Sequence, residues 1–248
     1  MIRNISLIAI NELRRLFKSP FAWIILATTQ FLMAIFFYLL LSQYMGASSV
    51  TSGLTDIVVS GMYQICGVIM LLISPLLTMR LITEERRLGT IKLLVSSPIT
   101  ITELVLGKYF GIITFYCLIL LMINLMPVSL MFGTQLDLGQ IASGLIGLSL
   151  LMSTFAAIGL FISSLTSSPA IAAISTFGVL FLLWIINYAG INASESMAEV
   201  FAYMSLLKHY TNLLTGVFNS VDVLFYIIVS VFFIILSIWR LDTERIYG

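Results

Sequence analysis

The sequence predicts an all-α polytopic membrane protein that forms a single transmembrane domain over residues 1–248. Hydrophobic residues make up 60% of the chain and charged residues only 9%, whereas soluble proteins carry roughly 25% charged residues. Helices are favoured because backbone amides in lipid must find their hydrogen bonds within the same segment, and a helical span needs about 20 apolar residues. Six runs meet this length: 21–41, 57–79, 109–132, 141–162, 170–190 and 221–239.

The distribution of lysine and arginine predicts the orientation, since positive residues are retained in the cytoplasm. Four basic residues lie in the first twenty positions, five in 80–108 and two in the tail, against Lys208 alone on the other side. We therefore expect both termini and segment 80–108 to be cytoplasmic and segment 191–220 to lie outside. A net charge of +1 without a basic patch argues against a nucleic-acid partner.

Residues 1–20 predict an amphipathic helix before the first span. No apolar core precedes a small-residue cleavage site, so the segment is not a signal peptide. A basic amphipathic helix lies in the membrane interface; the alternative is an N-terminus that only sets topology. The apolar face holds Ile2, Ile5, Ala9, Leu13, Leu16 and Phe17, and the polar face holds Arg3, Asn4, Asn11, Arg14, Arg15 and Lys18.

Segment 80–108 is the one sizeable polar block, with eight of the 23 charged residues. Gly89 weakens a helix there and Pro98 stops it. Thr100 and Glu103 then form the pattern of a capping box, which starts a new helix. The block therefore predicts a short amphipathic helix facing water, a stop, and re-entry into the membrane. It is either a solvated loop that fixes topology or a docking surface for a cytosolic partner.

The fourth run is rich in small residues at intervals of four, which close helix–helix contact requires. These are Ser143 and Gly147, followed by Ser149, Ser153 and Ala157. Residues 163–169 then predict a tight turn, with Ser168 as the cap and Pro169 as the first residue of the fifth helix.

The chain carries no recognisable catalytic pattern. It has no phosphate-binding loop, metalloprotease helix or nucleophile elbow. Apart from Asp222 at the second position of the sixth run, the six runs contain no lysine, arginine, aspartate or glutamate, although ion-coupled carriers usually need an ionisable group within the membrane. His209 is the only histidine and has no cysteine cluster near it, which favours a structural or interfacial role over metal binding. We expect no cofactor or metal on this chain.

Segment 191–220 predicts one or two re-entrant or interfacial helices; the alternative is a loose loop. Residues 201–218 are too apolar for a free loop, yet Lys208, His209 and Asn212 argue against full burial. A half-buried helical lid over the outer end of the membrane domain fits both features. We expect Gly216 to let the chain turn back and Asp222 to cap the sixth helix. The predicted lid residues are His209, Tyr210, Gly216 and Asp222.

Four stretches together resemble the membrane subunit of ABC type-2 transporters. Residues 84–98, Glu-Glu-Arg-Arg-Leu-Gly-Thr-Ile-Lys-Leu-Leu-Val-Ser-Ser-Pro, are similar to that family's Glu-x-x-x-Gly-Thr-x-Glu-x-Leu-Leu-x-x-Pro motif. Lys92 stands where the family often has glutamate. The other stretches are 105–108, the turn 159–169, and 208–216 followed by Asp222-Val223. The last is closest in pattern to the gliding-motility and nitrous-oxide-reductase-maturation permeases.

This resemblance implies a type-2 ABC exporter fold in the bacterial cytoplasmic (inner) membrane, with a connecting helix near 3–18 and a coupling helix within 82–95. It implies two ATP-binding subunits that hold ATP and Mg, and a second permease copy or close relative. Membrane lipid and an extracytoplasmic accessory protein are further partners to expect. Glu85, at a solvated position, and Arg86 would be polar docking contacts, while Leu88 and Ile91 would fill a groove. The full set of expected ATPase-coupling residues is Glu84, Glu85, Arg86, Leu88, Gly89, Ile91, Ser164 and Thr166.

The favoured function is therefore a permease subunit that hydrolyses nothing itself and exports its cargo. The alternatives are an ion-coupled secondary carrier and a non-transporting membrane scaffold. An adjacent ATPase reading frame would favour the first. The sequence leaves open the cargo and the choice between homodimer and heterodimer.

Overall fold

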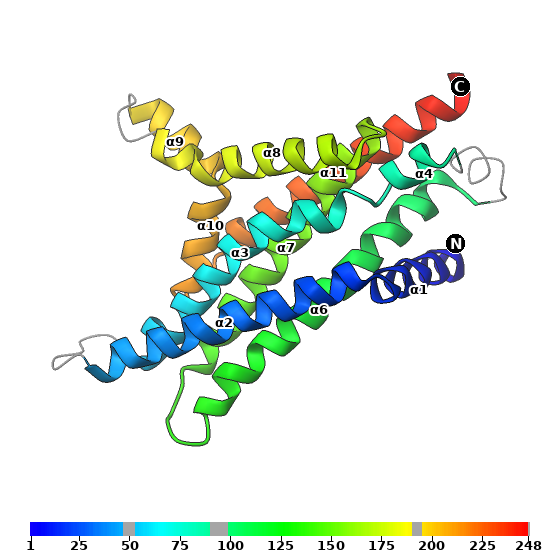
Figure 1. Cartoon of the computed structure of the whole chain (residues 1–248). Helices are drawn as coiled ribbons and strands as arrows, with labels where there is room; N and C mark the ends of the chain where they lie inside the picture. Colours follow the sequence, from blue (N-terminus) through cyan, green and yellow to red (C-terminus); the bar gives the residue numbers. More distant parts are fainter. Residues whose placement is uncertain (47–52, 90–98, 190–194, 248) are drawn as a thin grey trace.

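The computed structural model describes residues 1–46, 53–89, 99–189 and 195–247. This part of the chain consists of helices joined by short connections and contains no strands (Figure 1). Six helices are long and apolar enough to cross a membrane, which confirms the predicted six spans. They are α2 (Pro20–Gly46), α3 (Gly61–Thr78), α6 (Ile101–Leu130), α7 (Leu138–Leu165), α8 (Pro169–Ala189) and α11 (Ser220–Tyr247).

Helices α2, α7 and α11 extend past the predicted apolar runs at both ends, because helical hydrogen bonding continues into the flanking polar residues. Helix α6 begins at Ile101, where the Thr100–Glu103 capping box is present as predicted. Pro169 is the first residue of α8, also as predicted. The second span opens differently, with a π-helical segment, η1 (Thr55–Ser60), that runs directly into α3.

Helix α7 is the centre of the bundle and packs against α3, α6, α8 and α11. In the apolar stretch of α7, 67% of the residues are buried. The corresponding share is 22% for α2, α8 and α11, which therefore form the periphery. Small residues bring neighbours close, as predicted, and the neighbours belong to the same chain. A side chain at Gly144 would meet Tyr63, and one at Gly147 would meet Leu213. These small residues serve intrachain packing.

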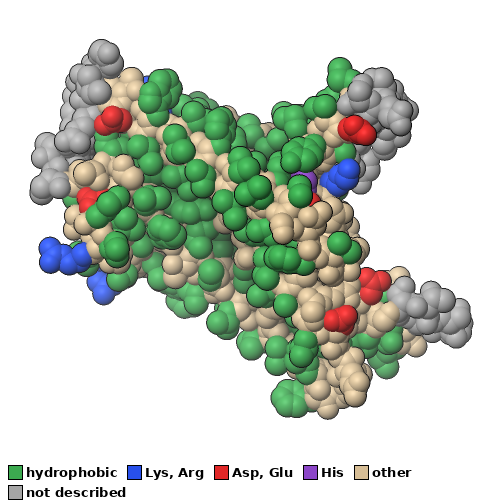
Figure 2. Space-filling model, turned by 180° about the vertical axis from the view of Figure 1, so that it is seen from behind, with side chains coloured by type: hydrophobic (Ala, Val, Ile, Leu, Met, Phe, Trp, Pro, Cys, Tyr) green, Lys and Arg blue, Asp and Glu red, His purple; other side chains and the backbone are tan. Residues whose placement is uncertain are grey.

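Both chain ends and the short helix α4 (Thr83–Arg87) lie at the same end of the molecule (Figure 1). Helix α1 (Ile2–Lys18) lies at this end too. Figure 2 shows hydrophobic side chains across the broad middle of the surface, with charged side chains toward the ends. This distribution is the one expected of a protein whose middle faces lipid.

Two short helices, α9 (Glu195–Met204) and α10 (Leu206–Leu214), occupy the segment between α8 and α11. Helix α9 lies at the end away from the termini (Figure 1). Helix α10 buries one face, including Leu206, Tyr210 and Leu213, and packs on α7 and α8. The described part of this segment is thus a packed helical element rather than a loose loop.

Candidate coupling site

Helix α1 lies directly on α6 at two glycines. A Cβ placed on Gly107 would lie 2.6 Å from the Cβ of Ile8, and one on Gly111 would lie 2.8 Å from that of Glu12. Such distances are too short for real side chains, so only glycine permits this approach. The Gly-x-x-x-Gly spacing is the one that lets two helix backbones come together.

The close approach buries a cluster of three charged residues from three helices. Lys108 Nζ lies 3.3 Å from Glu12 Oε2 and 2.6 Å from Glu85 Oε1. Their side chains are 3%, 6% and 17% exposed, respectively. Because a buried charge is tolerated only when it is paired, the nearly fully buried Lys108 needs these carboxylates. The cluster thereby joins α1, α4 and α6.

Helix α4 is also held by α7. The N-cap residue of α4, Ile82, has no side chain that accepts a hydrogen bond from the first amides of the helix. Instead, the N–H groups of Ile82 and Thr83 donate to Ser163 Oγ at 2.9 and 3.2 Å. Ser163 is fully buried; it lies in the last turn of α7 and is the first residue of the predicted 163–169 turn. The structure therefore brings together the two regions in which the sequence predicts coupling residues.

Further ion pairs surround this cluster at the surface. Arg15 pairs with Glu12 on its own helix and lies 3.7 Å from Glu84 of α4. Arg86 Nη2 lies 2.6 Å from Glu244 Oε2, which attaches α4 to the C-terminal end of α11. Together with the buried cluster, these pairs connect α4 to α1, α6 and α11.

The start of α1 is anchored separately on α6. Glu103 Oε1 lies 3.3 Å from the amino group of Met1, and Asn4 Nδ2 donates to both Glu103 oxygens at 3.3 Å. The same carboxylate closes the capping box with the Thr100 amide. One buried side chain thus fixes both the start of α6 and the position of α1.

The predicted coupling residues fall into two groups. Leu88 is 64% exposed, Glu84 is half-buried, and Gly89 adopts a positive φ of 70° after the end of α4. Glu85 and Arg86 turn inward to the pairs described above, so the expectation that Glu85 is solvated is wrong. Their own chain supplies partners for them.

The other predicted positions lie near α7. Ser164 is fully buried and donates to the carbonyl of Phe161 at 2.6 Å. Thr166 is half-buried and its hydroxyl accepts from the amide of Ser168. Ile91 lies outside the described residues.

Sequence reasoning missed Glu12 and treated Lys108 as a solvated charge. The pairing partners are 96 residues apart in the chain, so no local pattern connects them. The usable signal was Gly107-Lys-Tyr-Phe-Gly111, a small-residue pair that predicts a close helix contact around the lysine.

Two of the predicted lid residues, His209 and Asp222, form a second buried polar cluster. His209 Nδ1 lies 2.5 Å from Asp222 Oδ1, and His209 Nε2 lies 2.9 Å from the carbonyl oxygen of Tyr203. The ring stacks on Phe225 with centroids 4.1 Å apart. His209 and Asp222 are 5% and 3% exposed, so the expectation that His209 resists burial is wrong. The imidazole is buried because both of its nitrogens have partners.

The predicted helix cap at Asp222 is also corrected. Asn219 Oδ1 accepts from the Val221 amide at the start of α11, while the Asp222 carboxylate turns to His209 and Asn212. Tyr210 donates to the carbonyl oxygen of Tyr63 at 2.6 Å, and burial raises the pKa of this phenol well above its usual value. Helix α10 is therefore attached to α3 as well as to α11.

The described residues include no group of three His, Cys, Asp or Glu side chains that could hold a metal ion.

No curated protein matches the sequence at a significant level. A family model of ABC-2 family transporter proteins matches residues 6–245, which run from α1 to the last turns of α11. The six spanning helices agree with this assignment. The chain therefore belongs to the ABC-2 family of membrane transport proteins.

Proposed function

We propose that this chain is the permease subunit of an ATP-driven exporter in the bacterial inner membrane. Two copies, or one copy and a close relative, would form the translocation pathway. Two cytosolic ATP-binding subunits would bind ATP and Mg and drive transport. The pattern of residues 208–223 favours the gliding-motility and nitrous-oxide-reductase-maturation branch. Both termini would be cytoplasmic, in agreement with the positions of the basic residues.

The observation that carries this proposal is the connection of α4 to the bundle. A short helix of five residues has little stability of its own. Here it is held by the buried Lys108–Glu85 pair, by Ser163, and by the Arg86–Glu244 pair. A push on α4 is therefore transmitted to α6, α7 and α11 together, which is the mechanical requirement for a coupling element.

The exposed side of α4 provides the docking surface in this proposal. Leu88 projects an apolar side chain into solvent beside Arg87, and Glu84 is half-exposed. An exposed leucine next to charged residues is a suitable anchor for a groove on a partner. We assign Leu88 and Glu84 to partner contact. Glu85, Arg86 and Ser164 would instead hold the coupling element in place.

The lid at the opposite end would close the outer side of the pathway. An apolar groove of about 350 Å³ lies beside α10, lined by residues that include Leu206, Phe225 and Val229. The buried His209–Asp222 pair fixes α10 on α11 next to this groove. Movement of α11, which also carries Glu244 at the coupling end, would therefore reach both ends of the molecule.

Affinity purification of the tagged chain from its native membranes tests the proposal. We expect an ATP-binding subunit to co-purify, with an intact mass that fits two membrane and two ATP-binding subunits. Leu88→Asp should reduce the recovered ATP-binding subunit at least tenfold. Leu138→Asp, which alters an equally exposed leucine at the start of α7, should leave it unchanged.

Wild-type protein that reaches the membrane without any ATP-binding subunit would contradict the proposal. Transport by the purified chain without ATP hydrolysis would instead establish the ion-coupled carrier. A complex with one membrane subunit per ATPase pair would refute the paired arrangement while leaving the coupling assignment in place.

A further inference from the structure

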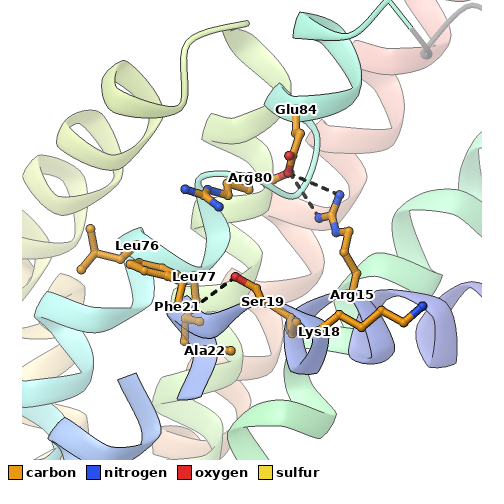
Figure 3. A pocket seen from close by; sticks show the side chains of 10 residues that line it. Arg15, Lys18, Ser19, Phe21, Ala22, Leu76, Leu77, Arg80 and Glu84 are labelled. Atoms are coloured by element: carbon orange, nitrogen blue, oxygen red, sulfur yellow. Dashed lines mark hydrogen bonds and ion pairs between the residues drawn. The ribbon is translucent and has the colours of Figure 1, made fainter. Parts of the chain in front are cut away.

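A pocket of about 290 Å³ lies where α1, α2, α3 and α4 meet. Figure 3 shows its mixed lining, with Arg15, Lys18, Arg80 and Glu84 around Phe21 and Leu77. The roles proposed above for the coupling site and for the lid assign no function to this pocket. It combines a charged rim with an apolar interior, and this combination restricts the class of molecule that it can bind.

The rim has an excess of positive charge, with three cationic side chains against one carboxylate. Arg15 is already paired with Glu12 and Glu84. Among the described residues, Arg80 and Lys18 make no ion pair, and both are exposed. The Arg80 guanidinium lies 5.3 Å from the centroid of the Phe21 ring, a cation–π distance that holds the group over the pocket. Two cations thus remain available for an anion.

The pocket continues into an exposed apolar track on α3. Leu76 lines the pocket, and Leu72 and Val68 follow it at intervals of four on the same helix face. All three are exposed, at 40%, 54% and 45%. At 1.5 Å per residue the track is about 12 Å long. It runs from the charged rim toward the apolar middle of the bundle.

The pocket also lies at the boundary between polar and apolar surface. Trp23 is exposed near the start of α2 and donates its indole N–H to the carbonyl oxygen of Phe17 at 2.9 Å. Tryptophan at such a boundary marks the level of lipid headgroups. Lys18 and Arg80 therefore stand at headgroup depth, and the apolar track stands at acyl-chain depth.

We propose that this pocket is a binding site for an acidic phospholipid. The phosphate would lie on the Arg80 guanidinium, and an acyl chain would cover Leu76, Leu72 and Val68. The Lys18 side chain extends to the opposite side of the pocket (Figure 3) and would reach the headgroup by rotation of its long side chain. A zwitterionic headgroup would bring its own cation to a rim that is already positive. A free phosphate would leave the apolar track uncovered. The arrangement therefore selects a lipid with a net negative headgroup.

Native mass spectrometry of the purified full-length chain in neutral detergent tests this site. The probes are dioleoyl phosphatidylglycerol and dioleoyl phosphatidylcholine at equal concentration, which differ only in the headgroup. We expect the wild type to retain phosphatidylglycerol at least tenfold more strongly. The double variant Lys18→Gln/Arg80→Gln should retain phosphatidylglycerol about tenfold more weakly than the wild type, since each cation near a lipid surface adds to binding. The readout needs no ATP-binding subunit, so it is independent of the proposed transport function.

The matched control is Arg14→Gln/Arg87→Gln, which removes the same charge from two exposed arginines that do not line the pocket. This control variant should retain phosphatidylglycerol at least half as strongly as the wild type does. Equal losses in both double variants, or no headgroup preference in the wild type, would overturn the proposal. Glycerophosphoglycerol and inorganic phosphate should displace the lipid only at concentrations at least a hundredfold higher. Displacement at equal concentration would overturn the assignment to a lipid.

Discussion

Lys108 Nζ lies 2.6 Å from Glu85 Oε1, and this contact joins the membrane-spanning helix α6 to the short helix α4. The same ammonium lies 3.3 Å from Glu12 Oε2 of α1. One buried cation thus compensates two carboxylates from different helices. Apart from Asp222, the six predicted apolar runs contain no lysine, arginine, aspartate or glutamate, and therefore gave no indication of a buried ion pair. In fact, a charged cluster lies at the end of the bundle where the termini and α4 meet.

Replacement of Lys108 by methionine should destabilise the protein strongly, because it leaves Glu12 and Glu85 without their shared cation. Removing one partner of a buried pair costs about 3 kcal/mol or more. For a chain of this length that corresponds to a fall of roughly 6–12 °C in the midpoint of thermal unfolding. The measurement is thermal unfolding of the purified chain in detergent.

The control for this change is Arg87→Met, an exposed cation on α4, which should shift the midpoint by less than 2 °C or so. Lys108→Met combined with Glu12→Gln and Glu85→Gln should recover much of the loss, since no uncompensated charge remains. Equal stability of Lys108→Met and Arg87→Met would show that the cluster contributes nothing.

What the sequence predicted well depends on short-range physics. The apolar runs locate the six helices, and the Thr100–Glu103 box locates the start of α6, because each is set by residues within a few positions. The return of the chain at Gly216, which has a positive φ, was also predicted from the local sequence. Gly89 was predicted only to weaken the helix, and the structure gives it a positive φ after the end of α4.

What it could not predict depends on which helices meet. Glu12, Glu85 and Lys108 look like ordinary solvated charges until α1 and α4 are placed on α6. Asp222 looks like a helix cap until α10 brings His209 to within 2.5 Å of it. A charged residue near a helix end can remain solvated or cap the helix, or it can form a buried pair with another helix. Only the tertiary arrangement decides between these outcomes.

The crossing of α3 and α7 should depend on Gly159. A Cβ there would overlap with the side chain of Thr78, so Gly159→Ala forces the two helices apart. Overpacking of this kind typically costs 1–3 kcal/mol, or roughly 3–9 °C in the unfolding midpoint. Gly178→Ala on α8 meets open space and should be neutral or slightly stabilising. Stability of Gly159→Ala equal to that of Gly178→Ala would disprove the close crossing.

Labelling with a membrane-impermeant thiol reagent should reveal the orientation. In a chain with Cys66 and Cys117 replaced, Gln135→Cys and Thr215→Cys should react from outside intact cells, whereas Ser6→Cys should react only after permeabilisation. The reason is that basic residues concentrate at the end carrying both termini. Reaction of Ser6→Cys in intact cells would reverse the topology.

The polar cluster of the lid should hold α10 in place. Asp222→Ala leaves the buried ring of His209 and the amide of Asn212 without their acceptor, and an unsatisfied buried group costs about 1–3 kcal/mol. Amide hydrogen exchange in α10 should become at least tenfold faster, with α7 unchanged. Glu199→Ala, at an exposed acid of α9, serves as the control. Fast exchange of α10 already in the wild type would exclude a packed lid.

The return of the chain from α10 to α11 should depend on the backbone of Gly216. Its φ of 81° lies in the left-handed region, where a branched side chain costs about 1–2 kcal/mol. Space is not the limit, since an added Cβ would lie 3.6 Å from Gln140. Gly216→Leu should therefore lower the unfolding midpoint by roughly 2–6 °C, and Gly216→Asn by clearly less, because asparagine tolerates this conformation.

Gly133→Leu provides the comparison at a glycine without a positive φ and with open space around it. Recovery of the ATP-binding subunit should be unaffected in all three variants, because Gly216 and α4 lie in separate parts of the fold. If leucine and asparagine at position 216 were equally harmless, the left-handed turn would have no role in holding α10 against α11. Loss of the ATP-binding subunit in Gly216→Leu would instead show that this change disturbs more of the fold than the local turn.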